Sequence, residues 1–289
     1  MLLGSRMPAL TSLALALIFS QQPLALAMII NSISSRLPRL QDLTLVSTES
    51  WEDGAQQVWE QLGSITQLTS LKVHFDNHRV EAVDTSKGCL LPHLAPLRNL
   101  TGLQQLHITS CKQLQHGGEE QGQQGGGFEF LGELTALTDL EIAVPSTHGF
   151  TSISSCTALQ RLWLRPVRNS SGGGCLSDED WEAVGQLGHL TQLHINMKHQ
   201  PRSLSAQQPF YAALQKLSQL HSVGDCIWTA AALPILAGLP RLRHVSGLWS
   251  GIGDAAGARC EQVTSLQISG NIDIDINIAT FPNLEVFCH

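Results

Sequence analysis

Apolar residues recur along this chain in a single nine-residue pattern. The pattern is an apolar residue, two variable positions, an apolar residue, two variable positions, a leucine, one variable position and a final apolar residue. Six copies follow it closely, at residues 37–45, 65–73, 100–108, 134–142, 156–164 and 187–195. Weaker copies occur at 214–222, 236–244, 260–268 and 278–286. This regular recurrence predicts a repeat architecture.

The last three positions of the pattern predict a short strand, because apolar residues on either side of one variable residue point to the same face. A single unit cannot bury its own leucines, so neighbouring units must stack and their strands must form a parallel sheet. The leucine that opens the closing pair marks each unit: Leu43, Leu71, Leu106, Leu140, Leu162, Leu193, Leu220, Leu242, Leu266 and Leu284. The gaps between these markers run from 18 to 35 residues.

These residues resemble the leucine-rich-repeat family, and the variant with Thr after the first leucine is similar to irregular arrays in green-algal and plant proteins. The resemblance covers residues 37–287. It implies an α/β solenoid, a curved right-handed superhelix with parallel strands on its concave face and helices and loops on its convex face. The family often places Asn or Cys three residues after the last strand position. Asn271 and Cys111 fit this rule, whereas Pro145, Val167 and Lys198 do not, so we expect an irregular array.

Segments between the strands predict helices and loops. Residues 177–187 open with Ser177 as a helix N-cap, followed by acidic residues in the first turn, and residues 51–62 have a similar pattern. Trp59 and Trp181 are expected to face the core from these helices. The runs at 113–129 and 168–176, rich in Gly, Gln and Ser, are predicted to be surface-loop insertions.

The first residues allow two interpretations. Residues 7–15 match the repeat pattern, with Leu13 at a normal distance of 30 residues before Leu43, so we expect a degenerate first repeat over 1–36 and the array over 37–289. Alternatively, Arg6 and the apolar run that follows it form a signal peptide over 1–27. The run is too short for a membrane span. Neither end shows a polar capping unit, so the open ends allow end-to-end self-association.

The net charge of the chain bears on the kind of partner it binds, and its cysteines bear on the compartment in which it resides. The formal net charge is −7 and the pI is about 5.9, whereas a nucleic-acid-binding protein usually carries a basic stripe, so we expect no nucleic acid. The seven cysteines are scattered, with no CxxC pair, which favours a reducing compartment. Cys156 and Cys260 occupy apolar repeat positions and are expected in the core.

Catalytic and metal-binding motifs are missing from the sequence. It contains no phosphate-binding loop, dinucleotide fingerprint, HExxH motif or nucleophile elbow, so we predict no enzyme and no cofactor. Asp273, Asp275 and Asn277 resemble the start of a calcium loop, but the glycine and glutamate that such a loop needs do not follow. His194 and His221 are expected to be neighbours, and two histidines without a third ligand predict no metal site.

The variable residue between the two closing apolar residues should face outward on the concave side. These residues are Thr44, Lys72, His107, Glu141, Trp163, His194, His221, Arg243, Gln267 and Glu285. Trp163, flanked by Arg161 and Arg165, has the aromatic and arginine composition of an interface hot spot. Its alternative role is to shield the strand surface. The predicted partner-binding residues are His107, Glu141, Arg161, Trp163, Arg165, His194 and His221.

The function that fits this surface best is a non-catalytic scaffold that binds a partner protein on the concave face. A secreted or cell-surface recognition domain is the first alternative, and a mature chain starting at Met28 would support it. The substrate-recognition subunit of a ubiquitin ligase is the second; it would need a separate adaptor, because no F-box fits before Leu37. The resemblance implies the cytoplasm or the cytoskeleton, including the ciliary axoneme.

Overall fold

The strands form one continuous parallel sheet. The computed structural model describes residues 9–17, 23–47, 55–75, 91–109, 128–144, 150–166, 176–196, 204–249, 258–268 and 278–288. Eleven strands pair in sequence order, each parallel to the next. They are β1 (Ser12–Leu17), β2 (Asp42–Ser47), β3 (Ser70–Phe75), β4 (Gln105–Thr109), β5 (Asp139–Val144), β6 (Arg161–Pro166), β7 (Gln192–Ile195), β8 (Ser222–Trp228), β9 (His244–Trp249), β10 (Ser265–Ile268) and β11 (Val286–Cys288).

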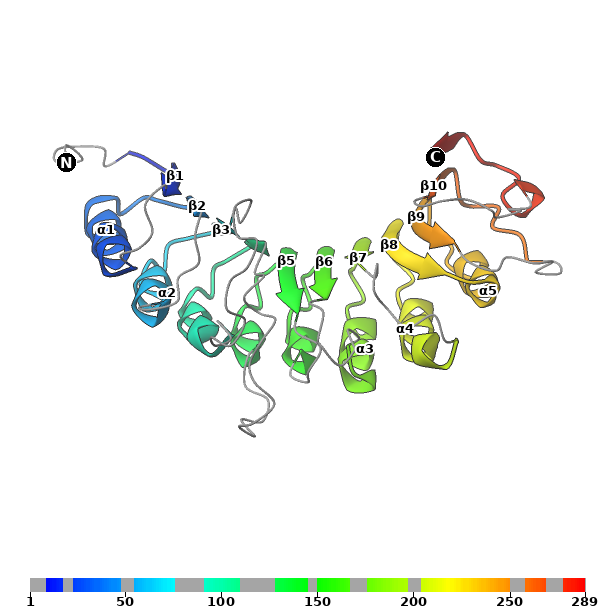
Figure 1. Ribbon diagram of the computed structural model, residues 1–289, viewed down its shortest axis with the longest axis horizontal. Coiled ribbons are helices and arrows are strands. Elements are labelled where there is room, and N and C mark those ends of the chain that lie inside the picture. The colour runs from blue at the N-terminus through cyan, green and yellow to red at the C-terminus, as the bar shows by residue number, and fades with distance from the viewer. Residues whose placement is uncertain are drawn as a thin grey trace, which may run out of the picture.

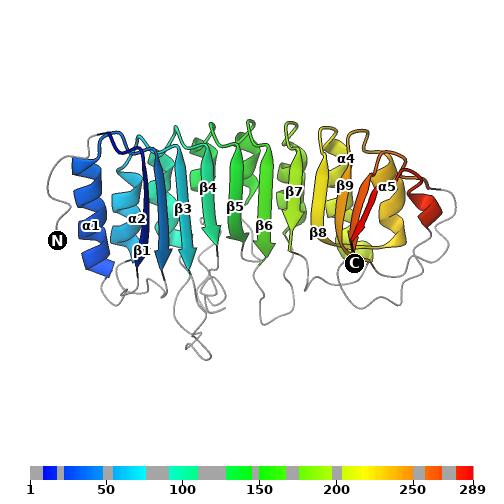
Figure 2. The ribbon, with the colours of Figure 1, turned by 90° about the horizontal axis from the view of Figure 1, so that it is seen from above.

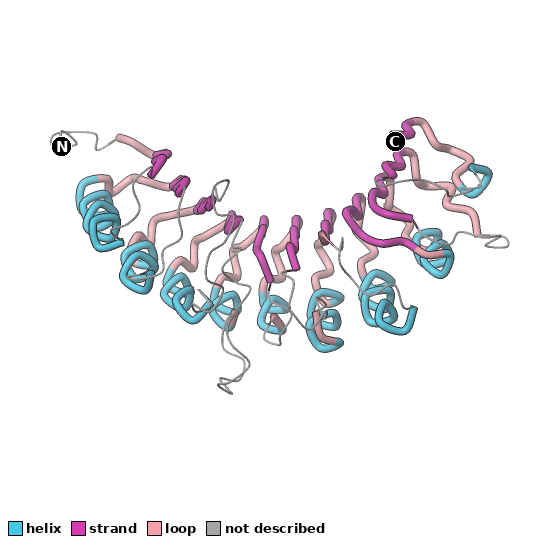
Figure 3. Tube along the Cα trace, in the orientation of Figure 1, coloured by secondary structure: helices cyan, strands magenta, loops and turns pink. Residues whose placement is uncertain are grey.

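Helices occupy the other side of the molecule. Figure 1 shows an arc with the strands along its inner edge and the helices along its outer edge, and Figure 3 shows the same two layers by colour. The α-helices are α1 (Pro23–Arg36), α2 (Ala55–Gly63), α3 (Asp178–Gly185), α4 (Leu204–Lys216) and α5 (Leu233–Ala237). In other units 3-10 helices take their place: η1 (Leu91–Asn99), η3 (Glu129–Glu133), η4 (Thr151–Ser155) and η6 (Ile278–Thr280). A further 3-10 helix, η5 (Ala230–Ala232), leads directly into α5.

The same turn precedes successive strands. In the unit before β5, the Leu137 amide donates to the Leu134 carbonyl at 3.0 Å, which closes a tight turn at the two outer apolar positions. The Gln104 carbonyl of the preceding unit then accepts from both the Thr138 and Asp139 amides, at 2.8 and 3.0 Å. This shared carbonyl recurs from unit to unit and aligns each strand with its neighbour. The repeated turn and the strand register make the fold a leucine-rich-repeat solenoid.

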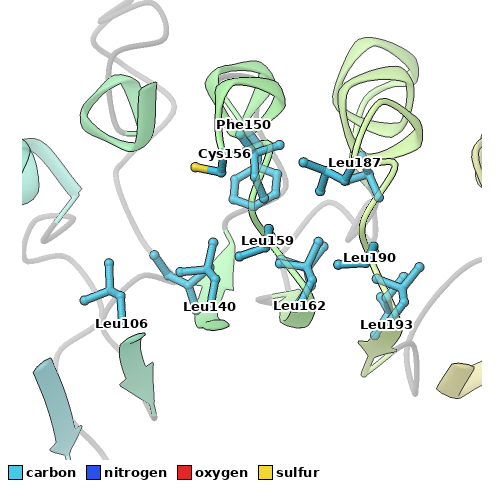
Figure 4. Close-up of a cluster of buried hydrophobic side chains, with 14 of the residues drawn as sticks. Leu106, Leu140, Phe150, Cys156, Leu159, Leu162, Leu187, Leu190 and Leu193 are labelled. Atoms are coloured by element: carbon cyan, nitrogen blue, oxygen red, sulfur yellow. The ribbon is translucent and has the colours of Figure 1, made fainter. Parts of the chain in front are cut away.

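The core is a continuous apolar layer between the sheet and the helices. Strand leucines from successive units point into it and are fully buried, as Figure 4 shows for Leu106, Leu140, Leu162 and Leu193. Phe150, Cys156 and Leu187 close the layer from the helical side. Because each strand leucine lies next to the leucines of both neighbouring units, the core has no boundary between repeats.

Two cysteines behave as the sequence predicted. Cys156 and Cys260 are both fully buried, and burial raises the pKa of each thiol to about 11. Cys156 Sγ donates to the Leu131 carbonyl at 3.3 Å, so the thiol is satisfied within the core. Cys226 is also a buried free thiol, and burial raises its pKa further. The prediction that Cys156 and Cys260 are core residues is confirmed.

The predicted helix over 177–187 forms as α3, which is shorter at both ends. Ser177 Oγ accepts from the Asp180 amide and Asp180 Oδ2 accepts from the Ser177 amide, both at 3.2 Å, which is a complete capping box. The other oxygen, Asp180 Oδ1, accepts from the Phe150 amide at 2.9 Å and so links α3 to the preceding unit. Trp181 in α3 and Trp59 in α2 are buried as predicted.

One predicted insertion ends earlier than its composition suggested. Phe128 lies within the predicted loop 113–129, yet it is buried and packs edge-on against Phe150 with ring centroids 5.5 Å apart. The aromatic ring therefore belongs to the next unit. The rest of this loop, nearly all of the insertion 168–176 and the predicted Asn and Cys positions after the strands, including Cys111 and Asn271, lie outside the described residues.

Three of the weak repeat copies are shifted by three residues from the predicted alignment. The register pairs Leu193 with Val223, Val223 with Val245, and Leu266 with Phe287, so Leu220, Leu242 and Leu284 are not strand markers. In these units apolar residues continue every three positions, so a shift of three still matches most of the pattern. The corrected gaps from Val223 to Val245 to Leu266 to Phe287 are 22, 21 and 21 residues, which is more regular than predicted.

Residues 12–17, near the start of the chain, take part in the sheet. Strand β1 pairs with β2 and sets Leu13 opposite Leu43, as the sequence alignment expects. Helix α1 follows and buries Leu26 and Ala27, so the bond after Ala27, where the alternative places signal-peptide cleavage, lies within a packed helix. Which alternative holds stays a prediction. Among the described residues, no helix has the length and apolar character needed to cross a membrane.

We expect Leu162→Ala to lower the free energy of unfolding by about 2–5 kcal/mol, because it opens a cavity where three units meet. Urea unfolding followed by circular dichroism measures the change. Leu24→Ala is the matched control: Leu24 is 64% exposed on α1, so its truncation should change the free energy by less than about 0.5 kcal/mol. Equal effects of the two substitutions would contradict the described core.

Candidate functional site

The outward-facing side chains of the central strands lie in parallel rows on the concave face. Figure 2 shows this side, with the strands next to one another in sequence order. The register places His107 opposite Glu141, Glu141 opposite Trp163 and Trp163 opposite His194. A neighbouring row contains Gln105, Asp139, Arg161 and Gln192. Adjacent strands are about 4.8 Å apart, so side chains in a row contact directly.

Two ion pairs join β6 to β5 on either side of Trp163. Arg161 Nη2 lies 2.7 Å from Asp139 Oδ2, and Arg165 Nη2 donates to Glu141 Oε1. The predicted arrangement of two arginines around Trp163 is therefore present on one face. The structure adds the two carboxylates that hold the arginines in place.

His107 lies between the same two carboxylates. Its Nε2 is 3.2 Å from Asp139 Oδ2 and its Nδ1 is 3.6 Å from Glu141 Oε2. Burial would raise the pKa of Asp139, but the contact with His107 and the positive charge of Arg161 outweigh it, so the pKa lies below its ordinary value. Asp139 is therefore a carboxylate at neutral pH, although its side chain is only 7% exposed.

Trp163 stacks on His194 of the next strand. The ring centroids are 4.2 Å apart and the planes differ by 19°. Both rings are partly exposed, so they form a flat aromatic surface in the middle of the concave face. On its other side, His194 Nδ1 lies 3.7 Å from Asp225 Oδ2.

An irregularity in β8 makes room for this stack. Register with β9 breaks between Val223 and Cys226, and Asp225 has a positive φ of 59° within the break. Gly224 pairs with His194, and a Cβ there would lie 2.6 Å from His194 Nδ1 and would also contact Ser246 Oγ. The missing side chain lets His194 occupy the space above β8.

His221 does not lie in the predicted row. The strand partner of His194 is Gly224, because the unit is shifted by three residues from its predicted alignment. His221 precedes β8, where its amide donates to the Thr191 carbonyl at 2.7 Å and its ring Nδ1 lies 2.7 Å from the Gln219 carbonyl oxygen. The prediction that His194 and His221 are neighbours is wrong. For the same reason the middle row continues through Ser246, and not through Arg243.

Within the residues that the structure describes, no group of three His, Cys, Asp or Glu side chains could hold a metal ion. The segment with Asp273, Asp275 and Asn277 lies outside those residues. The nearest approach to a charge cluster is His107 with Asp139 and Glu141. Both acids there are also paired with arginines, so all four charged side chains of β5 and β6 on this face are held by contacts with one another.

Comparisons with known proteins give structural likeness only. The sequence matches no known family profile and no curated protein. Solved structures with a similar backbone include an internalin (inlF) from Listeria monocytogenes. Its sequence is 17% identical, the match covers 84% of this chain and 71% of the internalin, and the TM-score is 0.40. An internalin C2 from the same species is 16% identical and covers 81% and 74%, with a TM-score of 0.35. The fold assignment rests on the strand register and the repeated turn.

Three contributors to this surface do not follow from the repeat pattern. The predicted row between the closing apolar positions does not include Asp139, which precedes the marker leucine Leu140 and faces the same side. The predicted alignment of the copy at 214–222 places Gly224 and Asp225 after the strand, whereas both lie within β8. A glycine followed by Asp within an apolar run is a signal for a bulge, and it could have corrected the alignment.

We expect Gly224→Ala to displace the His194 ring from Trp163, because the added methyl occupies the same space as the imidazole. In NMR spectra, the His194 ring protons should lose the upfield shift caused by the indole. Gly188→Ala is the control, since a Cβ at that position meets nothing within 4 Å. Unchanged His194 shifts in the Gly224 variant would contradict the described stack.

Asp139→Asn should lower the free energy of unfolding at pH 7, and this loss should shrink in acid. The folded-state pKa of Asp139 is below its unfolded value of about 3.9, so its carboxylate stabilises the fold above that pH and the contribution disappears as the pH falls through the folded pKa. Urea unfolding between pH 7 and about pH 3 measures it. A loss of the same size at pH 7 and at about pH 3 would refute the argument.

Proposed function

We propose that this protein is a non-catalytic scaffold that binds a partner protein on its concave strand face. The observation that carries the proposal is the aromatic surface of Trp163 and His194, set between Arg161 and Arg165 in the middle of the arc. Aromatic and arginine side chains held in fixed positions dominate the binding energy of many protein interfaces. The strands of the solenoid form a long, rigid surface that holds these side chains at fixed spacings.

The packing of the surface supports this role. Trp163 does not contribute to the leucine core, because it alternates with the buried Leu162 and Leu164 on the opposite face of β6. Its ring is partly exposed even though a core with room for Trp59 and Trp181 exists on the other side of the sheet. Ion pairs hold both flanking arginines, so little side-chain freedom is lost on binding.

The same proposal puts the chain in a reducing compartment such as the cytoplasm. The support is that Cys156, Cys226 and Cys260 are free thiols buried in the core, where they pack as apolar residues. A cytoskeletal or axonemal location rests on sequence resemblance alone, and so does an algal or plant lineage.

Site-specific crosslinking tests where the partner binds. A photo-crosslinking residue at Gln192, next to Arg161 on the concave face, should capture a partner from cells, whereas the same residue at the exposed Glu182 of α3 should not. Mass spectrometry identifies the captured protein. Capture from Glu182 alone would place binding on the convex side and refute the proposal.

With that partner purified, Trp163→Ala should weaken binding at least about tenfold, because it removes the central aromatic contact. Isothermal titration measures the affinity, and an unchanged melting temperature shows that the fold is intact. Glu182→Ala is the control on the convex side and should bind as the wild type does. Wild-type affinity of the Trp163 variant would show that Trp163 only shields the strand.

A further inference from the structure

The charges on β5 and β6 are unequally exposed. Arg161 and Arg165 have side chains that are 46% and 47% exposed, whereas those of their partners Asp139 and Glu141 are 7% and 14% exposed. The pairs are neutral in sum, yet the groups that an approaching molecule meets are the guanidinium groups. This chain carries a net charge of −7, so the middle of its concave face differs in character from the protein as a whole.

Each arginine keeps capacity for a second acceptor. A guanidinium has five N–H donors in a fixed plane. Among the described residues, Arg161 contacts its carboxylate through Nη2, and so does Arg165. The buried Asp139 and the half-buried Glu141 hold the guanidinium groups in position, while the remaining donors on the exposed side are available to an incoming anion. Such pre-positioned donors bind carboxylates with good geometry.

The spacing along β6 defines the shape of the ligand. Trp163 lies two residues from each arginine on the same face, and the two arginines are four residues, about 13 Å, apart along the strand. An extended peptide has the same rise per residue. A sequence with an acid, any residue, an apolar residue, any residue and an acid therefore presents both acids and its apolar side chain at matching intervals.

Basic side chains continue on one side of β6, and an acidic side chain lies on the other. On one side, Lys72 of β3 and His107 of β4 lie in the same row as Trp163. On the other side, Asp225 of β8 is 49% exposed and lies 3.7 Å from His194. The carboxylate of Asp225 therefore marks the position on β8 where the basic region ends.

We propose that the concave face binds an extended acidic segment of its partner protein, in which two carboxylate side chains four residues apart reach Arg161 and Arg165 and an apolar side chain between them packs on Trp163. This inference rests on the proposed scaffold function and specifies the chemistry of the partner. Charge complementarity carries it: the exposed donors are basic, and their own counterions lie below the surface.

Selection from a displayed library of random 12-residue peptides tests the proposal on the full chain. Peptides that bind should be enriched in Asp or Glu at two positions four apart, with an apolar residue midway. For a selected peptide, fluorescence polarisation should show about tenfold weaker binding to Arg161→Gln and to Arg165→Gln. Arg161→Lys keeps the charge but loses the planar set of donors, so it should weaken binding by less than Arg161→Gln does. Raising the salt from about 50 to about 500 mM should also weaken binding.

Two controls separate recognition from folding. Arg98→Gln removes an exposed arginine on η1 and should bind as the wild type does. Replacing the two acids of the peptide with Gln should weaken binding about tenfold without any change in the protein, so the test survives if an arginine variant folds poorly.

Enrichment of neutral or basic peptides that Trp163→Ala abolishes would overturn the acidic-segment inference and leave concave binding intact. Peptides insensitive to both Trp163→Ala and the arginine substitutions would overturn both proposals. If a single-stranded oligonucleotide of the same charge binds as tightly as the selected peptide, the surface attracts polyanions in general. That result would refute specific recognition of two acids four residues apart. Selection of no peptide above the level of the Trp163→Ala protein would also refute the inference.

Discussion

Burial of the strand leucines between neighbouring units is the interaction on which the rest of the structure depends. Each unit exposes its apolar residues unless another unit lies beside it, and the leucines of successive strands meet in one continuous layer. The shared carbonyl before each strand keeps the units in register while this layer forms. Stability is thus distributed along the arc, and a single large-to-small change in a strand leucine weakens the contacts of three units.

Because the core lies on one side of the sheet, the side chains on the concave face are not needed to fill it. In β6, Leu162 and Leu164 point into the core, so Arg161, Trp163 and Arg165 must point away from it. These three residues are not needed to fill the core, yet contacts with neighbouring strands hold them in place. Two carboxylates of β5 fix the arginines, and His194 of β7 fixes the indole. A pre-arranged surface of this kind loses little entropy when a partner binds.

The bulge in β8 shows how a local departure from the repeat contributes to that surface. A regular strand would place a side chain opposite His194, and its methyl group would occupy the position of the imidazole. Gly224 removes this conflict, and Asp225, which follows it with a left-handed backbone conformation, has a carboxylate oxygen 3.7 Å from the histidine. The irregularity therefore sets one edge of the basic region, and it arises where the sequence pattern is least regular.

The sequence by itself determined the fold class, the direction of the strands and most of the core, because apolar spacing dictates which side chains can be buried together. It also placed Arg161, Trp163 and Arg165 on one face, since alternation in a strand is a local property. It did not determine the register of the last units: apolar residues every three positions fit two alignments, and only stacking of neighbouring strands selects one, which separates His221 from His194. Only the tertiary structure paired Asp139 with Arg161, because ion pairs between units depend on which residues the register brings together.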